Sequence, residues 1–277
     1  MISLTHDRTA IHSSFLDPDR RDDLKELFTE AFNGTLGDTA VKKKLFSSSR
    51  WKKAKPQLQA ETSGKCAFCE TPTSAVYFGD IEHFRPKSAY WWMAYCYENF
   101  LFSCRVCNGK KSNTHGFSGN RVPAPIFAQN MTEAQILALA EATVPEPRDT
   151  AMVAQFIQLA TQEQGDLPNP YYVDPEPLFA WEADEVLQEV WIKARDASPK
   201  AQAAAKAAEN VIDLNRDELL FLRWQTYERL LKLKNIADVA TGSVRDDVQD
   251  IMHDMTHAPQ PFAGMVRYFM RVEWNIP

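Results

Sequence analysis

Two pairs of cysteines constrain the fold of this chain more than any other feature. Cys66 and Cys69 form one C-x2-C pair, and Cys104 and Cys107 form a second. Two residues between paired cysteines allow one tight turn to present both sulfurs to the same ion, and structural zinc takes four such ligands in a tetrahedron. In a chain of 277 residues this spacing favours metal binding in a reducing compartment over a disulfide framework. We therefore expect one structural Zn²⁺, and we interpret the fifth cysteine, Cys96, as an ordinary buried thiol.

The segment between the two pairs has the pattern of a small β-hairpin followed by a helix. We expect strands within residues 76–84 and 99–103 and a helix within 104–113. This order places Glu82, His83 and Asn108 near one another. Carboxylate and carboxamide oxygens suit Mg²⁺ or Mn²⁺, and an imidazole that is not bound to metal can act as a general base. The three residue types fit phosphodiester hydrolysis.

The charge of the chain is unevenly distributed. The net charge is −6, yet residues 41–121 contain 14 Lys and Arg against 5 Asp and Glu, which leaves the rest of the chain at −15. Because a zinc ion with four thiolates subtracts only two charges, this segment stays strongly positive. Binding to a nucleic-acid backbone requires such a local positive charge. A basic surface that serves only solubility is the alternative.

The remaining chain is predicted to be mostly helical. An α+β fold, predominantly α-helical, is therefore expected, with a zinc-stapled core at 61–120 between a helical segment at 1–60 and a mainly helical region at 121–277. A hairpin is expected within 179–192, Asn215 with Glu218 has the spacing of a capping box, and Ser243 is expected to cap the last helix. The helices are expected at 22–33, 40–46, 50–59, 132–142, 151–164, 198–212, 216–241 and 244–255.

Neither a signal peptide nor a membrane span is recognisable. The first fifteen residues lack an apolar run, and the apolar runs elsewhere are far shorter than the roughly 18 residues that a transmembrane helix needs. We expect a cytoplasmic protein with no membrane contact.

The central segment resembles the HNH endonucleases, which are also called ββα-metal nucleases. The string E-H-F-R-P-K from Glu82 is similar to the family's D/E-H-x-x-P motif, and C-N-G-K-K-S-N from Cys107 is similar to its C-N-x-x-K-x-N motif. The resemblance implies a catalytic set in which His83 is the general base, Glu82 and Asn108 hold the catalytic ion, and Asn99 braces the loop. Glu replaces the commoner Asp, and Asn replaces the commoner last His, which favours Mg²⁺ or Mn²⁺ at the catalytic position.

Further residues of the segment suggest contacts with nucleic acid. We expect the cations Arg85, Lys87, Lys110 and Lys111 to contact nucleic acid, although some of them can serve solubility alone. An aromatic cluster has two interpretations, since it can stack on bases or, more commonly, belong to the core. Its members are Tyr90, Trp91, Trp92, Tyr95 and Tyr97.

A narrower resemblance is to HNH proteins of bacterial anti-phage systems of the Septu and retron-linked types. It rests on the motifs around Glu82, Asn99 and Cys107 and on loose downstream matches at Asn169-Pro170, Asp174-Pro175 and Leu214-Asn215-Arg216. It implies an ABC-type ATPase partner. The expected function is a metal-dependent endonuclease that hydrolyses DNA, and two alternatives remain: a non-catalytic zinc-ribbon module that binds nucleic acid or a partner, and a modification-dependent restriction enzyme.

Overall fold

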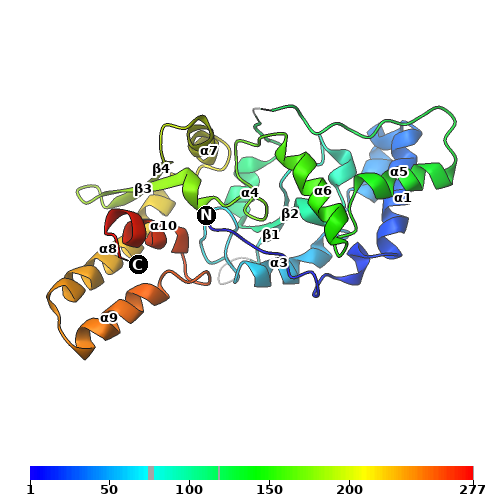
Figure 1. The fold of residues 1–277 in the computed structure, drawn as a ribbon. Helices are drawn as coiled ribbons and strands as arrows, with labels where there is room; N and C mark the ends of the chain where they lie inside the picture. Colours follow the sequence, from blue (N-terminus) through cyan, green and yellow to red (C-terminus); the bar gives the residue numbers. More distant parts are fainter. Residues whose placement is uncertain (74–77, 118, 277) are drawn as a thin grey trace.

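The computed structural model describes residues 1–73, 78–117 and 119–276 and has the expected α+β architecture (Figure 1). About half of the chain is helical, and two small antiparallel sheets lie among the helices. The helices and strands are α1 (Asp19–Phe32), α2 (Thr39–Leu45), α3 (Lys55–Glu61), β1 (Asp80–His83), β2 (Phe100–Ser103), α4 (Arg105–Lys111), α5 (Glu133–Thr143), α6 (Thr150–Thr161), β3 (Phe179–Asp184), β4 (Glu189–Ala194), α7 (Pro199–Asn210), α8 (Asp217–Val239), α9 (Ser243–Asp254) and α10 (Ala263–Tyr268).

A β-hairpin followed by a helix lies in the middle of the molecule (Figure 1). Strand β1 pairs with β2 in antiparallel register, with Glu82 opposite Leu101, and α4 begins two residues after β2 ends. The predicted first strand begins at residue 76, but residues 74–77 lie outside the described part, and the strand begins at Asp80. The order of two strands and one helix is as predicted.

The N-terminal helices pack on the aromatic segment. Helix α1 lies against α5 and buries Leu24, Leu27 and Phe28 in a core shared with Tyr90 and Trp92. Of the other aromatic residues, Tyr95 joins this core, Tyr97 belongs to a neighbouring core, and Trp91 is partly buried. The core interpretation of the aromatic cluster is thus confirmed. The predicted helix at 50–59 is divided into a 3-10 turn at Lys52–Ala54 and α3, whose first turn contains Pro56.

The cysteine pairs belong to the hydrophobic core of the C-terminal half. Cys66, Cys69 and Cys107 pack in one buried cluster with residues of β3, β4, α7, α8 and α10, including Ile192 and Trp224. This core contains residues from both sides of the expected boundary at residue 120. The core around α1 and α5 contains residues from all three expected segments. The three segments therefore share their hydrophobic cores.

Two predicted helix caps are wrong. Asn215 does not cap α8, because its side-chain amide accepts from Ile192 N at 2.9 Å and donates to Ile192 O at 3.1 Å in β4. Arg216 occupies the N-cap position of α8, without a side-chain cap. Ser243 is the first residue of α9, and Gly242 precedes it with positive φ, which glycine adopts without steric cost. Asn215 thus fastens α8 to the second hairpin.

The second hairpin is confirmed, with one difference at its turn. Phe179 and Trp181 of β3 and Val190 of β4 are buried as the alternation predicts. Val186 lies in the turn between the strands and is 91% exposed. Helix α10 and the π-helical turn Phe269–Glu273 were not predicted. Within the described residues, the helices are too short or too polar to cross a bilayer.

Candidate functional site

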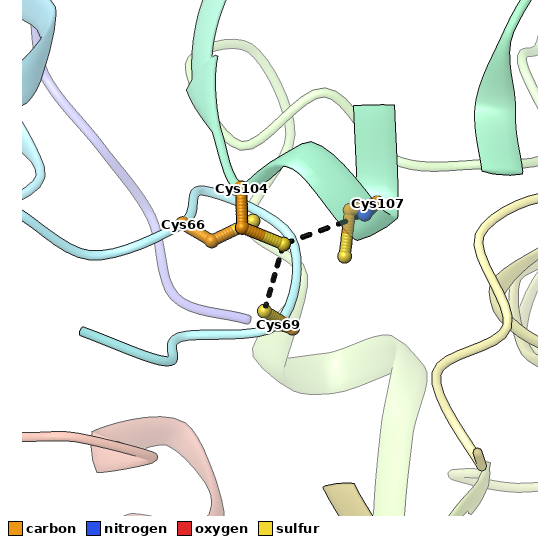
Figure 2. Close-up of side chains that lie close together, drawn as sticks. All are labelled: Cys66, Cys69, Cys104 and Cys107. Carbon is orange, nitrogen blue, oxygen red and sulfur yellow. Dashed lines mark hydrogen bonds between the residues drawn. The ribbon is translucent and has the colours of Figure 1, made fainter. Parts of the chain in front are cut away.

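The four paired cysteines converge on one point (Figure 2). Their sulfurs lie within 4.8 Å of one another, and Cys69 Sγ is 3.9 Å from Cys104 Sγ. The first pair lies on the loop after α3. Cys104 is the N-cap of α4, and its sulfur accepts from Cys107 N at 3.4 Å. Four converging sulfurs make the tetrathiolate set that a zinc ion takes.

The surroundings of the four sulfurs also fit a zinc ion. Zinc with four thiolates carries a charge of −2, and two arginines provide positive charge beside it. Arg216 Nη1 lies 3.8 Å from Cys107 Sγ. Arg223 is fully buried, and among the described residues no acceptor pairs with its Nε and Nη2 atoms. Burial lowers the pKa of Arg223 to about 10, and the negative charge of Cys69 opposes this decrease. Arg223 Nη1 donates one long hydrogen bond, to Asn215 Oδ1 at 3.5 Å, and a buried cation paired so incompletely is costly unless negative charge lies nearby. Both arginines therefore fit a zinc tetrathiolate.

The face of the first hairpin forms a cleft of about 460 Å³. Asp80 and Glu82, which lie two residues apart on one face of β1, line this cleft together with Asn108 of α4. Further lining comes from Trp51, His83, Lys87 and Arg105. The cleft thus contains the expected carboxylate, imidazole and carboxamide. Asp80 was missed, although its spacing of two residues from Glu82 in a strand was a usable signal, whereas nothing in the sequence points to Trp51.

His83 is held in one orientation inside the cleft. Its Nε2 lies 3.0 Å from the carbonyl oxygen of Ala94, and its ring meets the rings of Trp51 and Phe100 edge to face. Because a carbonyl oxygen can only accept, Nε2 carries the proton and Nδ1 is left as an acceptor. Burial, with the positive charges of Lys87 and Lys111, lowers the pKa of His83 to about 3. An imidazole near its reference pKa would be protonated below about pH 6, but this one stays neutral.

Glu82 is paired with Lys111 in the interior. Lys111 Nζ lies 2.7 Å from Glu82 Oε1 and 3.0 Å from His83 O, and its side chain is 1% exposed. Burial raises the pKa of Glu82, and the charge of Lys111 opposes the increase. Lys111 was expected to contact nucleic acid. The structure instead places it between α4 and β1 as the counter-ion of Glu82.

Arg85 is also buried rather than facing solvent. Its Nε lies 2.7 Å from Glu163 Oε2, and its Nη2 donates to Ala160 O at 2.8 Å. Glu163 also accepts from Tyr90 and His115. Burial alone would raise the pKa of Glu163, but these hydrogen bonds and the charge of Arg85 lower it to about 2. Arg85 was expected to contact nucleic acid, and the structure places its guanidinium in a buried ion pair with an acidic partner 78 residues away.

Asn99 bridges the turn that follows His83. Its Oδ1 accepts from Arg85 N at 2.8 Å, and its Nδ2 donates to Arg85 O at 2.9 Å and to Met93 O at 3.3 Å. These bonds to the main chain are what the expected bracing role of Asn99 requires. Asn99 is buried and does not line the cleft.

The other two expected cations remain near the surface. Lys87 lines the cleft, with Nζ 5.2 Å from the centre of the Trp51 ring. Lys110 is 55% exposed, and its Nζ lies 2.7 Å from Asp213 Oδ2. Cys96 is fully buried, as expected.

The fold and the site together define an α+β protein with a cluster of four cysteines that offers the ligands for one metal ion, and with a polar cleft lined by the same helix, α4. Over 96 residues the chain is 32% identical to a protein described as Septu protein PtuB from Bacillus mycoides (strain KBAB4). The matched stretch covers 29% of this chain and 32% of that protein, so it spans about a third of the relative's length. No family model and no solved structure matches the chain. This similarity supports the Septu-type part of the resemblance drawn from the motifs.

Proposed function

We propose that the protein is a metal-dependent endonuclease of the HNH type that hydrolyses phosphodiester bonds in DNA. One observation carries the proposal: Glu82, His83 and Asn108, which come from one strand and one helix, line a single cleft. The four-cysteine site lies at the start of the same helix, α4. A zinc ion there would fix the helix to the loop that holds Cys66 and Cys69, and so stabilise the cleft.

The residues of the cleft divide the chemistry among them. His83 Nδ1 is the free acceptor that removes a proton from an attacking water, and the hydrogen bond to Ala94 O aims the ring. Glu82 and Asn108 offer oxygen donors that would hold Mg²⁺ or Mn²⁺. When bound, such an ion neutralises charge on the phosphate and the leaving oxygen. Asn99 holds the main chain of Arg85 in place and thereby fixes the position of His83.

Cations near the cleft support a nucleic acid as the substrate. Lys87 and Arg105 line the cleft itself. Lys52 and Lys53 are exposed and follow Trp51, which also lines the cleft. Positive charges around an active-site cleft bind the phosphate backbone of either strand without reading the base sequence.

The test is cleavage of supercoiled plasmid DNA by purified protein with Mg²⁺ or Mn²⁺. Wild type is expected to nick or linearise the plasmid, and His83→Ala is expected to be inactive while its zinc content is unchanged. His257→Ala, at an exposed position in the segment that follows α9, serves as the matched control and should cleave like wild type. Cleavage by His83→Ala at the wild-type rate would overturn the assignment of the base.

A second candidate function is a non-catalytic module that binds nucleic acid or a partner protein. The pairing of Glu82 with Lys111 favours it, because the carboxylate is already neutralised. In that case the protein would bind DNA in gel-shift experiments, and neither Mg²⁺ nor Mn²⁺ would produce cleavage under any condition, with or without a partner.

We further propose a role in bacterial anti-phage defence together with an ABC-type ATPase. The similarity to Septu protein PtuB and the motif resemblance support this role. Co-expression with an ABC-type ATPase encoded by a neighbouring gene is the test. Reduced phage plating that is lost in His83→Ala would indicate a defence nuclease gated by its partner. Defence that is unchanged by His83→Ala would favour the binding module.

A further inference from the structure

The cleft contains more positive than negative charge. Its carboxylates are Asp80 and Glu82. Against them stand Lys87 and Arg105 in the lining and Lys111 directly behind Glu82. His83 is neutral and Asn108 carries no charge. Two negative and three positive groups do not favour a divalent cation, since each positive charge within a few ångströms of the ion repels it in a partly dehydrated site.

Lys111 is a positive group in direct contact with a proposed ligand of the ion, since its Nζ lies 2.7 Å from Glu82 Oε1. It follows Asn108 by three residues in α4, so both side chains lie on one side of the helix. Its ammonium donates to Glu82 Oε1 and to the carbonyl oxygen of the next residue, His83. Lys111 thus holds the carboxylate and the main chain of the proposed base together from inside the protein.

We propose that Lys111 is a built-in counter-ion of Glu82 that makes binding of the divalent ion depend on a phosphate of bound DNA. Without DNA, Lys111 neutralises Glu82 and repels the ion. When DNA binds, a phosphate adds negative charge on the open side of the cleft. Glu82, Asn108 and the phosphate would then hold the ion. The inference rests on the proposed nuclease function and adds a positioning and regulatory role for Lys111.

The physical reason is the balance of charge. One backbone phosphate makes the numbers of negative and positive groups around the ion equal. Since coupling between two ligands is reciprocal, the factor by which DNA tightens metal binding is also the factor by which metal tightens DNA binding. Metal that binds only together with substrate would keep the cleft inactive until DNA is present.

The experiment measures binding rather than cleavage and uses the His83→Ala protein as background, so that the DNA stays intact. Three full-length proteins are compared in that background: Lys111 unchanged, Lys111→Gln, and the matched control Lys110→Met. Gln retains a hydrogen-bond donor but removes the charge, and Lys110 is the exposed neighbour of Lys111 on α4. Mn²⁺ binding is followed by electron paramagnetic resonance without DNA. DNA binding is followed by fluorescence anisotropy of a labelled duplex with and without Mn²⁺.

With Lys111 present, weak Mn²⁺ binding is expected in the absence of DNA, and Mn²⁺ is expected to tighten DNA binding about tenfold. Mn²⁺ that binds directly to DNA phosphates competes with the protein and would weaken DNA binding instead. Lys111→Gln is expected to bind Mn²⁺ about tenfold more tightly without DNA and to lose most of the coupling. Lys110→Met should keep the Mn²⁺ affinity and the coupling factor of the background protein, because a DNA contact of Lys110 would change DNA affinity equally with and without Mn²⁺.

Two other outcomes separate the inference from the function on which it rests. Unchanged or weaker Mn²⁺ binding by Lys111→Gln, with zinc content and thermal midpoint preserved, would refute the counter-ion role and leave the nuclease proposal standing. If Lys111→Gln does not fold, the Mn²⁺ affinity of the background protein is the deciding measurement. Tight Mn²⁺ binding by that protein without DNA would refute the inference. Absence of Mn²⁺ binding in all three proteins, with and without DNA, would overturn the proposed metal site and the inference together.

Discussion

Nε2 of His83 donates to the carbonyl oxygen of Ala94 over 3.0 Å and thereby leaves Nδ1 as the acceptor of the ring. The two residues lie eleven positions apart, on β1 and on the aromatic segment that packs against α1. The core that buries Ala94 therefore controls which nitrogen of the proposed base is available.

The first prediction concerns this base. His83→Ala is expected to reduce DNA cleavage by about 10²- to 10⁴-fold, because a general base typically contributes that factor. The rate of plasmid cleavage is measured at saturating Mn²⁺. Zinc content should remain at about one ion per chain, since His83 does not contact the four cysteines. A loss smaller than tenfold would place the base elsewhere.

The second prediction separates the two asparagines. Asn108→Ala removes a proposed metal ligand, so raising the Mn²⁺ concentration is expected to restore part of its activity. Asn99→Ala removes three hydrogen bonds to the main chain of Arg85 and Met93. Added metal cannot replace these bonds, so Mn²⁺ should not restore the activity of this variant. Its thermal midpoint should fall, because several buried groups lose partners at about 1–3 kcal/mol each. Equal responses of both variants to Mn²⁺ would contradict the division of roles.

The third prediction concerns removal of zinc. Cys66, Cys69 and Cys107 share their core with β3, β4 and α8, and the core around α1 and α5 contains none of the four paired cysteines. Because metal binding and folding free energy are linked at such sites, chelation should destabilise the C-terminal half first. Hydrogen exchange by mass spectrometry should show loss of protection in α8 before α1. Uniform loss along the chain, or none, would refute the prediction.

The fourth prediction separates buried from surface cations. Arg85→Ala leaves Glu163 buried without its ion-pair partner, so we expect a loss of stability of about 3 kcal/mol or more. Lys87→Ala should leave the thermal midpoint nearly unchanged and weaken DNA binding, with a smaller salt dependence. Urea unfolding and binding at several salt concentrations measure the two effects. Unchanged stability and weaker DNA binding in Arg85→Ala would instead indicate that Arg85 contacts nucleic acid at the surface.

The fifth prediction concerns pH. The pKa of Glu163 is lowered from 4.5 to about 2 in the folded protein, so its carboxylate stabilises the fold above pH 4.5 and loses this effect as the pH falls toward 2. Such a shift corresponds to about 3 kcal/mol. Glu163→Gln should therefore be less stable than wild type at pH 7, and the difference should narrow between pH 4.5 and 3. Zinc loss in acid affects both proteins alike. A constant difference across this range would contradict the prediction.

Local features of the site were accessible from the sequence because their geometry depends on neighbours in the chain. The C-x2-C spacing brings two sulfurs to one turn whatever the rest of the fold is. Alternation in the strands and the apolar period of the helices predicted β1, β2 and α4 in order, and most of the helices elsewhere. These patterns also placed Glu82 and His83 at the end of a strand and Asn108 in the helix that follows.

Partners and burial were decided by the tertiary structure. Lys111 and Arg85 have the same charge in the sequence as Lys110 and Lys87. Only the fold brings Glu82 to Lys111, across 29 residues, and Glu163 to Arg85, across 78. A buried cation needs an opposite charge, and its identity depends on which elements pack together. The sequence alone therefore determined the elements and the donor types of the site. The packing of α4 on β1, and of the end of α6 on the turn after β1, determined which cations remain available to a substrate.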